Sequence, residues 1–254
     1  HVGELVSAVA GDSVTIEYMS QDNIPVHDYE PSAADLIRLQ EADIFFYHGL
    51  NLEPWVESTL SSLGEDAPPS YMTHAMPTGA SNLAYESMLI SDLCELMNDG
   101  PFESTTLGMV SDDHDEHGDD DHDDHGDDDH DEHGDDDHDD TLVGDGDGFT
   151  YDPHSWLSPL AFQAQINVVL ATLTSTFPNG SDSFTENAGS YSVQLMGLHE
   201  RYTAAFGVDG TCDMAGQEKT IVANHNAYSY MAVQYDIDII TLHGLDPEGE
   251  PSPA

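Results

Sequence analysis

Residues 111–148 contain a near-perfect eight-residue repeat, which restricts the fold more than any other part of the sequence. The unit His-Gly-Asp-Asp-Asp-His-Asp begins at His117, at His125 and at His133. A unit made of His, Asp and Gly offers no apolar side chain to bury, so it can form neither a core nor a stacked solenoid. We therefore expect a disordered surface insertion, and the hydrophobic core must come from the sequence on either side of it.

The insertion also carries regularly spaced imidazoles, which can bind metal ions weakly. Protons compete with a metal for the ring nitrogens, and the surrounding carboxylates favour the imidazolium form. We expect auxiliary, low-affinity metal capture that weakens as the pH falls, although an inert acidic tract is the plainer alternative. The histidines concerned are His114, His117, His122, His125, His130, His133 and His138.

Acidity extends over the whole chain. The sequence has 51 acidic residues and three basic ones (Arg38, Arg201 and Lys219), a formal net charge of −48, and 30 of the acids lie outside 111–148. Such a surface repels itself unless salt screens its charges, which predicts a protein from a halophile. Nucleic acids and anionic membranes are not expected as direct partners, because both require a basic surface.

The rest of the chain, in a sequence that is 38% apolar, alternates helix and strand patterns. Ser32 and Asp35 have the spacing of a capping box, which predicts a helix start. The alternation favours an α/β fold with parallel sheets. The expected strands are 13–18, 44–47, 220–223 and 237–242; the expected helices are 1–10, 53–63, 157–177, 183–206 and 227–234; and 88–96 is a helix or strand.

The organisation that follows is two α/β lobes joined by a long rigid helix. We assign 1–178 to the first lobe, 179–206 to the interlobe helix and 207–254 to a partial second lobe. About 48 residues after the long helix are too few for a covered parallel sheet, so we expect the second lobe to be truncated. The sequence opens inside a helical pattern without an initiator Met or a signal peptide, so we expect its start to be trimmed. Cys94 and Cys212 lack metal-site spacing, which leaves free thiols or a disulfide open.

Three histidines follow predicted strands. His27 lies beyond 13–18, His154 follows Phe149-Thr150-Tyr151 in the stiff turn Asp152-Pro153-His154, and His225 follows 220–223. Ligands of open α/β sheets bind beyond the carboxyl ends of the strands, so these imidazoles are expected at one site. Three neutral imidazoles suit Zn²⁺, with a fourth position for water or a carboxylate.

Five ordered motifs carry a family resemblance that covers nearly the whole chain outside the insertion. They are Pro25-Val26-His27-Asp28-Tyr29-Glu30-Pro31-Ser32, Glu41-Ala42-Asp43, Asn51-Leu52-Glu53-Pro54-Trp55, Asp152-Pro153-His154-Ser155-Trp156-Leu157-Ser158-Pro159 and His225-Asn226-Ala227-Tyr228-Ser229-Tyr230. Together they resemble the zinc-type metal-binding subunits of ABC transporters, the ZnuA/TroA-like family of cluster A-I solute-binding proteins.

The resemblance implies an extracellular, lipid-anchored receptor that captures Zn²⁺ between two lobes and delivers it to a membrane ABC permease. It implies His27, His154 and His225 as metal ligands, and His225 favours zinc over manganese because manganese-type relatives usually have a glutamate there. A fourth, acidic ligand would come from a later part of the second lobe, so none is named. A monomer with no catalytic activity is expected.

Other functions remain open at this point. The same three histidines could serve a zinc hydrolase or hydratase, in which metal-bound water is the nucleophile. A manganese receptor and a calcium-buffering acidic surface protein are further alternatives, although Ca²⁺ prefers oxygen ligands. Packing or solvent roles are expected for the remaining histidines, with a small chance that His243 reaches the site; they include His48, His74 and His199.

Overall fold

The computed structural model describes residues 1–20, 24, 26, 28–84 and 149–243. The predicted ligand His27, the element predicted at 88–96, Cys94 and the insertion with its seven histidines lie outside these ranges. Cys212 is a free, half-buried thiol. Within the described part, α-helices predominate and the strands form two small parallel sheets, so the predicted α/β class is confirmed.

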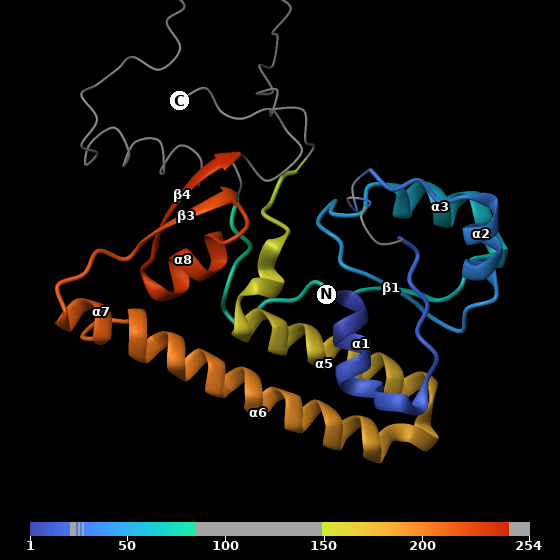
Figure 1. The fold of residues 1–254 in the computed structure, drawn as a ribbon. Helices are drawn as coiled ribbons and strands as arrows, with labels where there is room; N and C mark the ends of the chain where they lie inside the picture. The colour runs from blue at the N-terminus through green and yellow to red at the C-terminus, as the bar shows by residue number, and fades with distance from the viewer. Residues whose placement is uncertain (21–23, 25, 27, 85–148, 244–254) are drawn as a thin grey trace, which may run out of the picture.

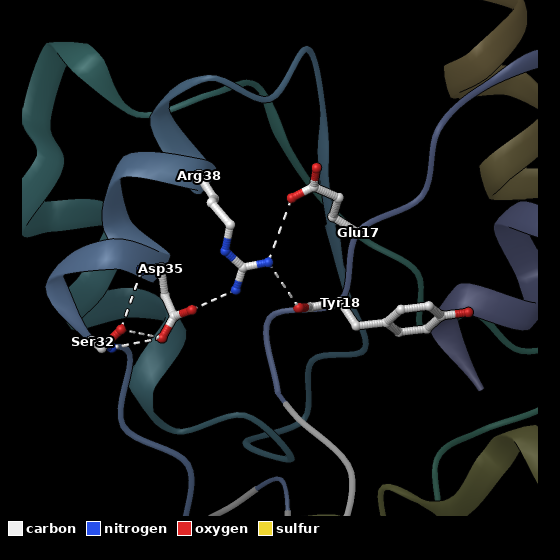
Figure 2. A network of polar contacts seen from close by, with 5 residues as sticks. All are labelled: Glu17, Tyr18, Ser32, Asp35 and Arg38. Atoms are coloured by element: carbon white, nitrogen blue, oxygen red, sulfur yellow. Dashed lines mark hydrogen bonds and ion pairs between the residues drawn. The ribbon is translucent and has the colours of Figure 1, made fainter.

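The first sheet joins β1 (Phe45–Tyr47) to β2 (Ser70–Met72), with Phe46 opposite Tyr71. Helices α2 (Ala33–Gln40) and α3 (Trp55–Leu63) contact each other and pack on β1 through Leu39, Phe45 and Val56. The predicted capping box at the start of α2 is present (Figure 2), because Asp35 N–H donates to Ser32 Oγ and Ser32 N–H donates back to the Asp35 carboxylate.

Three helices form the main hydrophobic core. They are α1 (Val2–Ala10), α5 (Pro159–Thr176) and α6 (Ser181–Phe206), and they contact one another pairwise. Their meeting faces bury Leu5, Val9, Ile166, Val169 and Phe184 almost completely. Each apolar side chain removed from water in this way stabilises the fold by about 1.5–3 kcal/mol.

Helix α6 has 26 residues and is therefore about 39 Å long. It packs on α1 and α5, and it also contacts the short helices α7 (Thr211–Met214) and α8 (Ser229–Tyr235). Figure 1 shows α6 running along one side of the molecule, past α5 and α1 to α7. This is the long helix predicted from the sequence.

The second sheet pairs β3 (Thr220–His225) with β4 (Asp238–His243) in parallel, and His225 lies opposite His243. Helix α8 forms the crossover between them, as expected for a right-handed βαβ unit. Residues Ile221 and Val222 of β3 remain exposed by 42% and 68%. The sheet is thus covered much less completely than the α1, α5 and α6 core.

One predicted strand is absent from the structure, and one observed strand was not predicted. The strand predicted at 13–18 does not form: the 3₁₀-helix η1 occupies Gly11–Ser13, and the extended stretch from Val14 pairs with no described strand. Strand β2 was not predicted, because Ser-Tyr-Met is short, polar and exposed in its second half. No single described helix has the length and apolarity of a membrane span; only the bent pair Pro159–Thr176 and Pro178–Met214, turned by 119°, meets those criteria.

Candidate metal site

His154 opens the 3₁₀-helix η3 (His154–Leu157) and is held by a buried carboxylate two residues earlier. Asp152 Oδ1 accepts both the backbone N–H of His154, at 2.8 Å, and its Nδ1, at 2.9 Å. Asp152 is 1% exposed and His154 6% exposed. Because an ionised carboxylate can only accept a hydrogen bond, the proton of the neutral His154 ring lies on Nδ1. Its Nε2 therefore carries the lone pair that a metal ion requires.

His225 ends β3, and its ring lies beside that of His154. Their ring centroids are 5.3 Å apart, with the ring planes inclined by 61°. Two imidazoles that share a tetrahedral zinc ion through nitrogens about 2.0–2.1 Å away have centroids separated by about 5 Å. The distance between these two predicted ligands therefore suits a shared metal ion.

Helix α8 is fixed to the turn that carries His154. The Tyr230 hydroxyl donates to the Asp152 carbonyl at 2.9 Å and accepts the Leu83 N–H at 3.3 Å. Ser158, at the start of α5, donates to Gln234 Oε1 at 2.7 Å. Burial raises the pKa of Tyr230 to about 12, so its hydroxyl keeps its proton at physiological pH. These bonds fix α8 against the turn that carries His154.

His48, at the end of β1, is fully buried in a cluster of rings. Its ring centroid is 4.7 Å from His1, 5.3 Å from His74 and 4.9 Å from Trp156. Neither ring nitrogen makes a hydrogen bond with another described residue, and the Pro153 carbonyl approaches without completing one. Burial lowers the pKa of His48 to about 3, and the neighbouring imidazoles act in the same direction.

The turn after His48 has an unusual backbone that a half-buried carboxylate stabilises. Gly49, Leu50 and Asn51 all have positive φ angles, which cost energy for the two non-glycine residues. Glu53 accepts the N–H groups of His48 and Gly49 at 2.8 and 3.1 Å. Burial raises the pKa of the Glu53 carboxyl.

His74 lies in a hydrogen-bonded chain beneath His154. Gln165 Nε2 donates to Ser155 Oγ at 3.0 Å, and Ser155 Oγ is 2.9 Å from His74 Nδ1. The other nitrogen, Nε2, is 2.7 Å from Asn82 Oδ1 and must donate to this acceptor. Burial lowers the pKa of His74, which is consistent with a neutral ring.

A cavity of about 490 Å³ is lined by His74 and not by His154 or His225. It reaches Tyr151, which forms an isolated bridge with Ala84. The cavity is lined by His74, Met76, Ala80, Ser81, Asn82 and Tyr151.

The structure thus brings together two of the three predicted ligands, and the third, His27, is outside the described residues. Among the described side chains, no group of three or more His, Cys, Asp or Glu residues converges closely enough to hold a metal ion. His199 contacts the Tyr235 hydroxyl at 3.1 Å, a packing role of the kind expected for it. The backbone of His243 pairs beside His225.

Sequence reasoning missed two contributors to the site. Asp152 belongs to the Asp-Pro-His motif but was given no role. Asp side chains often accept the backbone N–H two residues later and form an Asx turn, as Asp152 does with His154. Tyr230 was also overlooked, and its partners are 78 and 147 residues away in sequence, so no local pattern indicates them.

Comparison with known proteins gives a consistent result. The family model "Zinc-uptake complex component A periplasmic" (ZnuA) matches residues 1–254. The zinc-binding protein AdcA of Streptococcus pyogenes serotype M3 is 27% identical over 251 residues, which cover 99% of this chain and 39% of AdcA. The high-affinity zinc uptake system protein ZnuA of Bacillus subtilis is 23% identical over 251 residues, covering 99% of this chain and 61% of that protein.

The fold comparison agrees with the sequence comparison. The crystal structure of Zn(II)-bound AdcA from Streptococcus pneumoniae superposes with a TM-score of 0.59 at 22% identity, covering 99% of this chain and 39% of AdcA. The chain therefore spans 39% of the length of AdcA and 61% of the length of ZnuA, and the similarity extends over almost all of the chain itself.

Proposed function

Because the chain belongs to the ZnuA family of zinc-uptake components, we propose that it captures Zn²⁺ between its two lobes and delivers it to an ABC permease. His27, His154 and His225 are the proposed ligands. The observation that carries the proposal is the 5.3 Å separation of the His154 and His225 rings, and we assign these rings to different lobes. A zinc ion between them would hold the lobes together.

The chemistry of the donors supports zinc as the transported ion. Imidazole nitrogens suit Zn²⁺, whereas Mn²⁺ prefers sites richer in oxygen ligands. Asp152 accepts a hydrogen bond from His154 Nδ1 and fixes the orientation of its ring, as carboxylates behind the ligands do in zinc sites. The names of the relatives, a zinc-binding protein and a zinc uptake protein, agree with this choice.

The proposed role is binding and delivery, with no reaction catalysed. We place the protein outside the cell with a lipid anchor, because one relative is named a zinc-binding lipoprotein. We propose that it acts as a monomer. The histidines of 111–148 would increase the local zinc concentration by weak capture and would be dispensable for the tight site.

A competitive zinc titration in high salt, with residues 111–148 deleted, tests the proposal. We expect one tight site, lost when any of His27, His154 or His225 is replaced by alanine. His199→Ala is the matched control, since this histidine lies on α6 and bonds to Tyr235. A deletion variant without a tight site, or ligand variants that bind zinc as tightly as the parent, would contradict the proposal. Tighter binding of Mn²⁺ than of Zn²⁺ would refute the choice of ion.

A further inference from the structure

The hydroxyl of Tyr230 completes a backbone pair next to the candidate metal site. Leu83 and Asp152 follow the antiparallel bridge of Ala84 and Tyr151, and the Asp152 N–H donates to the Leu83 carbonyl at 3.0 Å. Residues of a hydrogen-bonded antiparallel pair exchange two such backbone bonds. Here the Tyr230 hydroxyl replaces the second bond, because it accepts the Leu83 N–H at 3.3 Å and donates to the Asp152 carbonyl at 2.9 Å. A side chain of α8 is thus part of the chain pair that contains Asp152.

The same aspartate holds the first proposed ligand. The Asp152 carboxylate accepts the backbone N–H and the Nδ1 of His154, at 2.8 and 2.9 Å. Asp152 therefore bonds α8 through its carbonyl and His154 through its side chain, and the residue is 1% exposed. A displacement of α8 relative to Asp152 is consequently a displacement relative to His154.

The second proposed ligand is joined to α8 by a short, hydrogen-bonded connection. The His225 carbonyl accepts the Ala227 N–H at 2.9 Å, and the Asn226 side-chain oxygen accepts the Ser229 hydroxyl at 2.8 Å. Asn226 and Ser229 are 2% and 1% exposed. The connection from His225 to Tyr230 is thus closed on itself by two bonds, so the position of α8 determines that of His225.

We propose that Tyr230 is a positioning residue that sets the separation of the two metal-binding imidazoles. This inference rests on the proposed function, in which His154 and His225 bind the transported ion. Their ring centroids are 5.3 Å apart, a separation that suits a shared zinc ion. Ligands that are held in the bound arrangement beforehand bind more tightly, because less order has to be imposed when the ion arrives.

A second hydrogen bond holds α8 in the same place. Gln234 follows Tyr230 by four residues and therefore lies on the same face of the helix. Its Oε1 accepts the hydroxyl of Ser158, the N-cap of α5, at 2.7 Å, and Ser158 is 4% exposed. Two bonds one helical turn apart restrict rotation of α8 as well as its translation, so Gln234 is expected to assist Tyr230.

The same helix offers a matched control. Tyr235 is buried like Tyr230, with exposed fractions of 2% and 5%, and its hydroxyl also makes a hydrogen bond, to His199 Nδ1 at 3.1 Å. That bond leads to the long helix α6 and not to Asp152. Tyr235→Phe therefore removes a buried tyrosine hydroxyl from α8 and leaves the connection between the two ligands intact.

The experiment measures zinc affinity by competitive titration of the intact chain in high salt, at a temperature where every variant is fully folded. Tyr230→Phe keeps the ring and removes the hydroxyl, and it should weaken zinc binding about three- to tenfold, as expected for the loss of a buried hydrogen bond that orders the site. Gln234→Met, which keeps the length of the side chain, should weaken binding about two- to threefold. Tyr235→Phe should leave the zinc affinity unchanged.

Two spectroscopic measurements report on the geometry itself. In the metal-free protein, ring protons of His154 and His225 should show a nuclear Overhauser effect in the parent and in Tyr235→Phe, and a weaker one in Tyr230→Phe. With Co²⁺ as a spectroscopic substitute for zinc, saturated Tyr230→Phe should give the absorption spectrum of the parent, because the metal ligands are retained. A general loss of stability would move neither the ring contact in folded protein nor the affinity.

The outcomes separate this inference from the proposed function. A zinc affinity of Tyr230→Phe within twofold of the parent would overturn the inference, and so would an equal loss in Tyr235→Phe, an undiminished Overhauser effect or an altered cobalt spectrum. If Tyr230→Phe does not fold, Gln234→Met decides in its place, and an unchanged affinity there overturns the inference.

Zinc binding that His154→Ala leaves unchanged would instead refute the proposed function, and the inference would fall with it. A loss of affinity in Tyr230→Phe and not in Tyr235→Phe, with a weaker Overhauser effect and the cobalt spectrum of the parent, supports the inference.

Discussion

Replacing Asp152 by asparagine tests how a carboxylate that does not itself bind metal controls the site. The Asp152 side chain is buried and accepts two hydrogen bonds from His154, at 2.8 and 2.9 Å. Asparagine keeps one oxygen acceptor and the volume but loses the negative charge. Its backbone carbonyl, which accepts the Tyr230 hydroxyl, is not altered.

The expected loss of zinc affinity is 10- to 100-fold. A carboxylate that accepts from the outer nitrogen of a ligand imidazole increases the basicity of the inner nitrogen and fixes the ring, and removing such a partner typically has this effect. The loss corresponds to about 1.4–2.7 kcal/mol of binding free energy. Stability should change less, because Asp152 Oδ2 makes no hydrogen bond with a described residue, so the amide group replaces an atom that was already unpaired.

The assay is a zinc titration alongside thermal unfolding of the metal-free protein. The reasoning predicts a large change in affinity with a small shift in Tm. An affinity within twofold of the parent would refute the role of Asp152. A Tm that falls by as much as a core substitution would show that the residue acts on folding instead.

Three further predictions use other parts of the structure. The pKa of His48 is about 3 in the folded state and ordinarily about 6.5, so the unfolded chain takes up the proton first as the pH falls. The free energy of unfolding of the metal-free protein should therefore decrease by about 2–3 kcal/mol between pH 7 and 4.5. In His48→Asn this decrease should be correspondingly smaller, as measured by urea titrations at both pH values. Tyr230→Phe leaves a buried carbonyl and N–H unpaired and should lower the free energy of unfolding by about 1–3 kcal/mol, which urea titration measures. Amides of 220–223, where Val222 is 68% exposed, should exchange with deuterium at least about tenfold faster than those of 166–173 in α5; equal rates would contradict this.

Local sequence patterns were sufficient to predict many of the helices and strands. The capping box at Ser32 identified the start of α2, and the apolar run before Gly49 identified β1, because these signals depend on neighbouring residues. The predicted strand 13–18 failed for the opposite reason: alternation of apolar residues predicts an extended chain, but a strand also needs a hydrogen-bonded neighbour.

The closeness of two of the three proposed ligands could be expected from the sequence, whereas their surroundings could not. His225 ends strand β3, where the rule for open α/β sheets expects a ligand, and His154 lies in the stiff Asp-Pro-His turn; the structure brings their rings to within 5.3 Å. The stacking of His1 on Trp156 at 3.8 Å and the burial of His48 beside them join positions far apart in sequence. Contacts of this kind depend on how α1, β1 and η3 pack, which no single segment encodes.

The two described halves of the proposed site differ in rigidity. His154 is held by Asp152, and the adjacent Ser155 is bonded to Gln165 on the buried helix α5. His225 ends a strand whose outer residues are exposed and which pairs with a single described neighbour. Release of a bound ion requires the ligands to separate, and the less buried element moves at the lower energetic cost. We therefore expect the His225 side to move when zinc is released, with His154 as the fixed reference, and the proposed exchange measurement on β3 and α5 tests this order directly.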